Sequence, residues 1–111
     1  MTTSAIEKSP GCIQTTLDIL GDKWTGLIIR DLSSAKARFG DLEASLQGIS
    51  PRTLSQRLDK LEKEQIIKKR LYCEHPPRYT YELTQKGTEL QAILVKMADW
   101  GARHHCRQDI A

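Results

Sequence analysis

Apolar residues recur at intervals of three and four along most of the chain, which is the spacing of one face of an α-helix. Four short helices are predicted before residue 65, and their apolar positions are, in chain order, Ile13, Leu17 and Leu20; Trp24, Leu27, Ile28 and Leu32; Phe39, Leu42 and Leu46; and Leu54, Leu58 and Leu61. Gly21 and Gly48 follow the first and third helices, where glycine readily ends a helix. The fourth helix should begin at Ser50-Pro51, a side-chain cap followed by proline, and run to about Glu64.

The pattern changes after the fourth helix. IIKKRLY (66–72) and RYTYEL (78–83) are short runs rich in β-branched and aromatic residues, and CEHPP (73–77) separates them. They predict two antiparallel strands joined by a loop, and Pro76 and Pro77 should stop either strand from extending through it. Thr84 should then cap a last helix, whose long apolar stripe consists of Leu90, Ile93, Leu94, Met97 and Trp100.

This order of elements predicts an α+β fold, mainly helical: a winged helix-turn-helix with a two-stranded β wing and a C-terminal dimerisation helix. The third and fourth helices form the helix-turn-helix pair, with Gln47-Gly48-Ile49 as the turn. The second helix of such a pair enters the major groove of DNA and reads base edges from its N-terminal half. We divide the chain into a flexible arm (1–11), the winged domain with its dimerisation helices (12–101), and a tail or end of the last helix (102–111).

Composition agrees with one small domain, since 39% of the 111 residues are hydrophobic and 28% are charged. The net charge of +3 is unevenly spread: residues 50–79 are net +4, whereas the remainder is net −1. Such a concentration is typical of a nucleic-acid contact surface, although an ordinary solvated face would look the same by charge alone. No segment has the pattern of a membrane span or a signal peptide, which predicts a cytoplasmic protein with no membrane partner.

The N-terminal half of the fourth helix carries residue types that read DNA: Arg52, Thr53, Gln56 and Arg57. Arginine pairs with guanine through two hydrogen bonds, glutamine pairs likewise with adenine, and threonine can hydrogen-bond a base or touch a thymine methyl. Lys60 lies farther from the helix start, which favours contact with phosphate or solvent. These types answer why the polar face of this helix is so rich in Arg, Thr, Gln and Lys.

Several motifs together resemble the HxlR family of bacterial winged-helix transcription regulators, which are relatives of the MarR group. They are LGDKWTGLIIRDL, RFGDLEASLQGISPRTLSQRLDKLE, PPRYTYELTQKG and ADWG, in this order, and they lie within residues 12–101. The resemblance implies a homodimer that binds a pseudo-palindromic operator in double-stranded DNA, as a repressor. It places Ser50, Arg52, Thr53, Gln56 and Arg57 in the major groove and Arg78 in the wing, near the DNA backbone or minor groove. Gln65 stands where the family often has glycine.

The three cysteines, Cys12, Cys73 and Cys106, are odd in number and widely spaced, which suits free thiols in a reducing compartment. Cys12 lies beside a predicted helix N-terminus, which favours the reactive thiolate. The resemblance implies a redox or electrophile switch near Cys12, with Cys106 of the partner as a candidate for an intersubunit disulfide and an oxidant or small electrophile as inducer. Modification of Cys73 could disturb DNA contact by the wing. The alternative for each thiol is a small buried apolar group or an unreactive surface group.

The apolar stripe of the last helix is longer than one small domain needs. Together with the first helix it is the candidate dimer surface, and the predicted residues are Ile13, Leu17, Leu90, Ile93, Leu94, Met97 and Trp100. Packing of this stripe within one subunit is the alternative.

Other functional classes have less support. His104, His105, Cys106 and Cys73-Glu74-His75 could supply metal ligands, but there is no Cys-x-x-Cys or His-x-x-x-His pair, so we predict no metal site. A regulator that responds to a small molecule or metal instead of thiol oxidation remains an alternative. A winged helix that serves only protein interaction would be expected to lose Arg52, Gln56 and Arg57. The sequence shows no catalytic motif, so we predict no enzyme activity, no catalytic residue and no cofactor.

Overall fold

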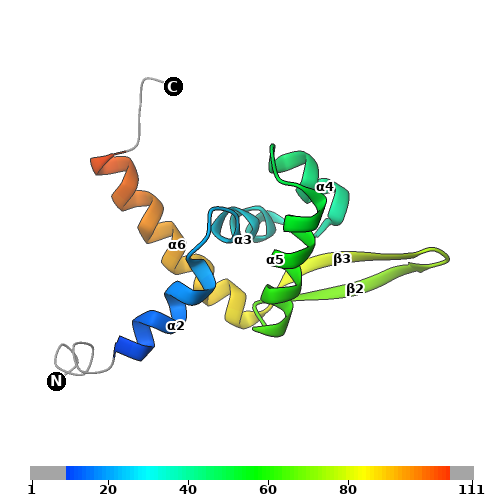
Figure 1. The fold of residues 1–111 in the computed structure, drawn as a ribbon, viewed down its shortest axis with the longest axis horizontal. Coiled ribbons are helices and arrows are strands. Elements are labelled where there is room, and N and C mark those ends of the chain that lie inside the picture. The colour runs from blue at the N-terminus through cyan, green and yellow to red at the C-terminus, as the bar shows by residue number, and fades with distance from the viewer. Residues whose placement is uncertain (1–9, 106–111) are drawn as a thin grey trace.

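The computed structural model describes residues 10–105, and the order of its helices and strands follows the prediction with one additional strand (Figure 1). The elements are α2 (Pro10–Leu20), α3 (Thr25–Ser34), β1 (Ala37–Arg38), α4 (Phe39–Ser45), α5 (Pro51–Lys63), β2 (Ile67–Glu74), β3 (Pro77–Leu83) and α6 (Gln85–His104). The fold is a winged helix-turn-helix, as predicted: α4 and α5 are the helix-turn-helix pair, and the β2–β3 hairpin is the wing.

The core lies where α3, α4 and α5 meet the start of β2. Its most deeply buried apolar side chains, each 0–1% exposed except Leu58 at 2%, are Ile28, Ile29, Leu42, Leu54, Leu58, Leu61, Ile66 and Ile67. The leucine stripe of α5 is therefore entirely buried inside the subunit. Burial of this stripe fixes which way the polar faces of α5 point.

Local signals at the helix ends work as predicted. The side chain of Ser50 accepts a hydrogen bond from the Thr53 amide (3.0 Å), with Pro51 as the first residue of α5. Thr84 accepts one from the Gly87 amide (3.1 Å) at the start of α6. Gly87 has no room for a side chain, because a Cβ there would lie 2.1 Å from the Ile66 carbonyl oxygen. The start of α6 therefore packs directly against the backbone just before β2.

The sheet differs from the prediction in two ways. It has three antiparallel strands in the order β1-β3-β2, and the two-residue β1 pairs with β3 through Ala37 and Arg38. Neither strand extends through the turn residues His75 and Pro76, as predicted, but the loop is shorter than the expected CEHPP segment, because Pro77 is the first residue of β3 and pairs with Glu74. Proline is tolerated there because the first residue of a strand can do without a ladder hydrogen bond. The wing is consequently longer and its turn shorter than expected.

The molecule is open in shape. Its radius of gyration is 15.9 Å, whereas a compact domain of this length has about 13 Å. Figure 1 shows the cause: the wing extends to one side, while α2 and the C-terminal half of α6 diverge on the other. Two helices that leave the body in this way expose faces that a single subunit does not cover.

The helix boundaries refine the expected division of the chain. Helix α2 begins at Pro10, within the segment expected to be a flexible arm, and α6 ends at His104, so residues 102–104 are the end of the last helix. Within residues 10–105 no helix is long and apolar enough to cross a membrane.

Candidate nucleic-acid interface

Helix α5 has a buried face and an opposite, exposed face. The exposed face carries Arg52, Gln56, Asp59 and Lys63, which follow one another at intervals of four, three and four residues and therefore lie in one row. We call these four residues the outer row. Arg52 and Gln56, two of the predicted base-reading residues, stand together at its N-terminal end. Asp59 was not part of the prediction, and its negative charge disfavours phosphate contact near the middle of α5.

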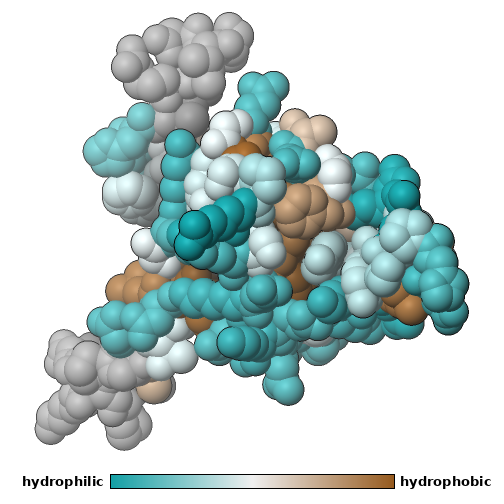
Figure 2. Space-filling model, turned by 45° about the vertical axis from the view of Figure 1, so that its right-hand side comes forward, coloured by the Kyte–Doolittle hydropathy of each residue, from teal (hydrophilic) through white to brown (hydrophobic). Residues whose placement is uncertain are grey.

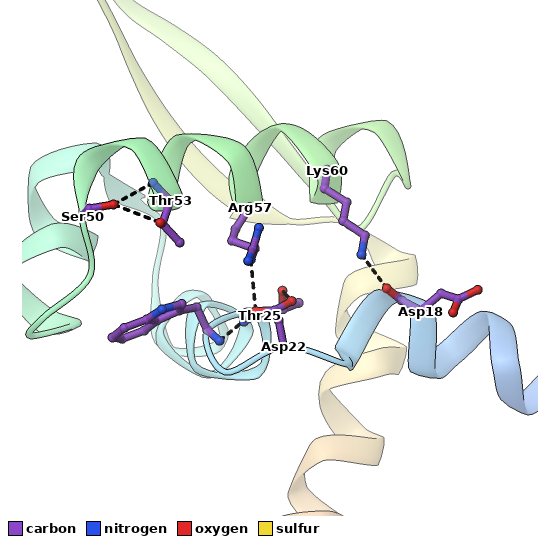
Figure 3. A network of polar contacts seen from close by, with 8 residues as sticks. Asp18, Asp22, Thr25, Ser50, Thr53, Arg57 and Lys60 are labelled. Carbon is purple, nitrogen blue, oxygen red and sulfur yellow. Dashed lines mark hydrogen bonds and ion pairs between the residues drawn. The ribbon is translucent and has the colours of Figure 1, made fainter.

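The first turn of α5 is held by Ser50 and Thr53. Besides accepting from the Thr53 amide, the Ser50 hydroxyl donates to the Thr53 hydroxyl at 2.9 Å (Figure 3). The capping role considered for Ser50 from sequence is therefore confirmed. Both hydroxyl groups lie at the end of α5 that would enter a groove first.

Arg57 and Lys60 point to the other side of α5, toward the corner where α2 leads into α3 (Figure 3). The Arg57 Nε lies 3.2 Å from Oδ1 of Asp22 and is itself buried; the two atoms form an ion pair without the alignment of a hydrogen bond. The Lys60 ammonium donates a hydrogen bond to the main-chain carbonyl of Asp18, near the end of α2. The structure thus separates Arg57 and Lys60 from Arg52 and Gln56 of the outer row, although these four residues were predicted as one DNA-binding set.

Asp22 is the centre of this corner, and sequence reasoning missed it. Its Oδ1 accepts hydrogen bonds from the amides of Trp24 (2.8 Å) and Thr25 (2.9 Å), and its Oδ2 accepts one from the Thr25 hydroxyl (2.5 Å). Burial raises the pKa of Asp22, but these hydrogen bonds and the Arg57 charge outweigh it and leave the pKa below its usual value. An aspartate three residues before a threonine at a helix start was the available signal.

The wing carries basic residues that are largely paired within the subunit. Lys68 and Arg70 both contact Glu82, the former at 4.0 Å, and Arg70 lowers the pKa of that carboxyl through a hydrogen bond. Lys69 points to the other face, where its ammonium lies 4.0 Å from Glu62 and 4.6 Å from the ring centroid of Tyr79. This alternation confirms that the three residues do not face one side together.

Arg78, predicted to contact DNA from the wing, is exposed near the start of β3 opposite Cys73. Together with Arg38 and Tyr72 it borders a hollow of 330 Å³ between the wing and the start of α4. Arg38 reaches Asp41 with its guanidinium, Nε lying 3.3 Å from Oδ2. Arg78 is therefore an exposed cation close to the turn at the tip of the wing, whereas the exposed Arg38 is paired with Asp41.

The two candidate sensing thiols within the described residues lie on other elements than the outer row. Cys12 is exposed on α2, and its carbonyl accepts a hydrogen bond from the Thr16 hydroxyl at 3.3 Å. Cys73 is half-buried in the wing, with its thiol 3.8 Å from the His75 carbonyl oxygen, while Cys106 lies outside the described residues. In the part of the chain that the structure describes, no three His, Cys, Asp or Glu side chains gather as metal ligands would.

Most of the side chains predicted for the dimer surface are exposed in the single subunit. Five of the predicted side chains are about half exposed: Ile13 50%, Leu17 52%, Ile93 49%, Met97 54% and Trp100 52%. Leu90 is corrected, because at 8% exposure it belongs to the core of its own subunit, and Leu94 packs partly against that core. Val95, exposed at 52%, was not predicted. Figure 2 shows apolar surface on the side of α2 and α6, between the two grey terminal segments.

Comparison with known proteins gives consistent matches. A family model described as HxlR-like helix-turn-helix matches residues 19–109. The uncharacterised HTH-type transcriptional regulator YdeP of Bacillus subtilis (strain 168) is 36% identical over 100 residues, covering 89% of this chain and 78% of that protein. Among solved structures, the reduced form of the transcriptional regulator YodB from B. subtilis has a TM-score of 0.73 at 34% identity and covers 83% of this chain and 90% of its own. The redox regulator HypR in its oxidised form has a TM-score of 0.77 at 30% identity, covering 86% and 98%.

Proposed function

The chain belongs to the HxlR-like helix-turn-helix family of transcriptional regulators, and we propose that it represses transcription as a homodimer bound to a pseudo-palindromic operator. The outer row of α5 is the observation that carries this proposal. It presents Arg52 and Gln56 at the N-terminal half of a helix whose opposite face is locked in the core. A rigid helix that offers such side chains to the major groove can read bases.

In this proposal Arg52 recognises guanine and Gln56 adenine in each half-site, while Thr53 and the capped first turn lie against the groove edge. Lys63, at the far end of the outer row, and Arg78 of the wing contact phosphates. Two α5 helices of a dimer would reach half-sites whose centres are one helical turn apart, about 34 Å. Arg57 and Lys60 are left out of this set because their cationic groups point to the α2–α3 corner.

The dimer is proposed to form through the exposed apolar side chains of α2 and α6. Ile13 and Leu17 on α2, and Ile93, Met97 and Trp100 on α6, are each about half exposed, which is costly for a protein that remains a monomer. Burial of these side chains against a second copy would remove that cost. A two-fold dimer would also match the two-fold symmetry of a palindromic operator.

The decisive experiment compares Arg52→Ala with Arg103→Ala in binding to DNA from around the protein's own gene. Arg103 is an exposed arginine on α6, so its removal changes the net charge equally. Loss of a bidentate arginine contact should weaken operator binding by about 1–3 kcal/mol per half-site, whereas Arg103→Ala should have little effect. Wild-type binding should also weaken steeply with salt, since several cations displace phosphate counterions.

Two results would contradict this proposal. Equal operator affinity of Arg52→Ala and the wild type would favour the protein-interaction alternative. A wild-type affinity independent of salt would argue against any DNA-binding surface of this kind.

Thiol control of DNA binding is a second candidate function, supported by the exposed Cys12 on the same helix as the proposed dimer contacts Ile13 and Leu17. The solved structures similar to this chain include the redox regulator HypR. We propose that an oxidant takes two electrons and two protons from Cys12 and a second thiol as their disulfide forms. A bridge between subunits would change the spacing of the two α5 helices and weaken operator binding.

This candidate is tested by operator binding before and after mild oxidation with a disulfide-forming reagent. Binding should be lost on oxidation of the wild type, restored by reductant, and retained throughout in Cys12→Ser; Cys73→Ser serves as the matched thiol control. If oxidised wild type binds as well as reduced, the regulator stands and responds to another signal.

A further inference from the structure

We propose that Asp22 is a positioning residue for DNA recognition, which holds the Arg57 guanidinium against the α2–α3 corner and so keeps it from adding a sequence-independent phosphate contact. The inference rests on the proposed function, because it concerns the same helix and the same DNA. It assigns to an acidic residue outside the helix-turn-helix pair an effect on how selectively α5 binds.

The geometry of Arg57 supports this role. Its side chain is 30% exposed and its Nε is buried, 3.2 Å from the Asp22 carboxylate, which is itself 23% exposed. Arg52 and Gln56, by contrast, are exposed on the outer row. In Figure 3 Arg57 leaves α5 on the side of α3, toward Asp22, and Lys60 leaves toward Asp18.

Asp22 is itself held firmly, so it can act as a fixed anchor. Three hydrogen bonds from Trp24 and Thr25 orient its two oxygens at the start of α3. The lowered pKa means that the carboxylate stays charged in neutral solution. About one turn further along α5, Lys60 forms a second contact with the α2–α3 corner, a hydrogen bond to the Asp18 carbonyl.

The consequence for selectivity follows from how the two kinds of contact contribute. A phosphate contact strengthens binding to every sequence alike, whereas base contacts strengthen binding to the operator only. A cation paired within the protein contributes to neither. Withdrawal of Arg57 therefore lowers affinity for random DNA and raises the ratio of specific to nonspecific binding.

The test is Asp22→Asn, which keeps a carbonyl oxygen for the Trp24 and Thr25 amides but removes the charge that holds Arg57. Affinity for random-sequence DNA should rise severalfold at low salt, and the slope of log affinity against log salt should steepen by about 0.9 for each added phosphate contact. Asp18→Asn is the matched control, since it removes one negative charge nearby from a side chain that accepts from Gln14 (2.8 Å). This control should leave the slope unchanged.

Arg57→Gln provides a measurement that does not depend on how Asp22→Asn folds. Since Arg57 is proposed to contact no phosphate in the wild type, Arg57→Gln should keep the wild-type salt slope, and the double variant should lose the steepening seen in Asp22→Asn. A slope that falls by about 0.9 in Arg57→Gln, or that steepens equally in the double variant, overturns the inference. If the wild type shows no specific DNA binding, the proposed function is wrong. If the wild type binds specifically but the salt slope of Asp22→Asn is unchanged, only the inference about Asp22 is wrong.

Discussion

Helices α5 and α6 have similar apolar stripes in sequence but opposite fates in the fold. On α5, Leu54, Leu58 and Leu61 are no more than 2% exposed. On α6, Leu90 is buried, but Ile93 and Met97 remain about half exposed. The difference teaches that an apolar stripe shows which face of a helix favours burial, whereas the neighbouring elements decide whether that face is buried within the same subunit.

The physical reason lies in the placement of the two helices. The leucine stripe of α5 belongs to one buried cluster with side chains of α3 and the start of β2, so the stripe is covered along its whole length. Helix α6 starts against Ile66 but then runs away from the body of the molecule, as Figure 1 shows, and residues 10–105 leave Ile93, Met97 and Trp100 of its second half about half exposed. The stripe of α5 therefore stabilises the subunit, whereas the exposed part of the α6 stripe is the surface proposed for dimerisation.

The largest effect on stability is expected from truncation of the buried stripe of α5. Leu58→Ala should lower the free energy of unfolding by about 2–5 kcal/mol, because it removes a packed side chain and leaves a cavity. Urea denaturation measures this change. Ser55→Ala, an exposed truncation on the same helix, should stay within about 0.5 kcal/mol of the wild type, and a similar loss in both would mean that the stripe is not the stabilising face.

Truncation of the other stripe should affect assembly instead. Trp100→Ala should weaken dimerisation by about 2 kcal/mol, or roughly 30-fold in the dissociation constant, because large aromatic residues dominate such interfaces. Sedimentation at several concentrations measures the constant. Asp99→Ala, whose exposed carboxylate pairs along the helix with Arg103 (3.5 Å), is the control, and equal dimerisation of all three proteins would remove Trp100 from the interface.

The end of α5 offers a smaller test of how rigidly this helix is held. Gln65 adopts the left-handed conformation, with φ of 64°, which strains a residue with a side chain. Gln65→Gly should raise the free energy of unfolding by about 1 kcal/mol, since relief of the strain outweighs the added freedom of the unfolded chain. Gln47→Gly, in the helix-turn-helix turn and without positive φ, should not stabilise. A lower urea midpoint for Gln65→Gly would contradict the strain argument.

Asp22, at the α2–α3 corner, predicts a small dependence of the free energy of unfolding on pH. The pKa of Asp22 is below its usual value, so the folded state binds fewer protons than the unfolded state over the acid range, and its contribution is lost as pH falls through the folded pKa. Below neutral pH, Asp22→Asn should therefore lose less stability than the wild type in denaturation measured at successive pH values. An identical pH profile for both proteins would show that Asp22 is not stabilised in its charged form.

The sequence by itself determined the order and type of the major elements. The signals were local: helical periodicity, the caps at Ser50-Pro51 and Thr84, and the change to β-rich runs after Glu64. The helices and strands formed where these signals predicted them. It also indicated α5 as the candidate DNA-facing helix, because the residue types at Arg52 and Gln56 do not depend on the rest of the fold. The two-residue β1 was beyond prediction, since Ala37 and Arg38 carry no periodic pattern.

Only the tertiary structure decided which polar side chains of α5 stay available and which apolar ones stay uncovered. Arg57 sits beside the buried stripe, and whether it turns outward depends on Asp22, a residue far away in sequence that folding brings within 3.2 Å. Likewise, Leu90 and Ile93 belong to one sequence stripe, but the point where α6 leaves the core separates them. Side-chain direction at the edge of a stripe is set by contacts distant in the chain, and no local pattern contains them.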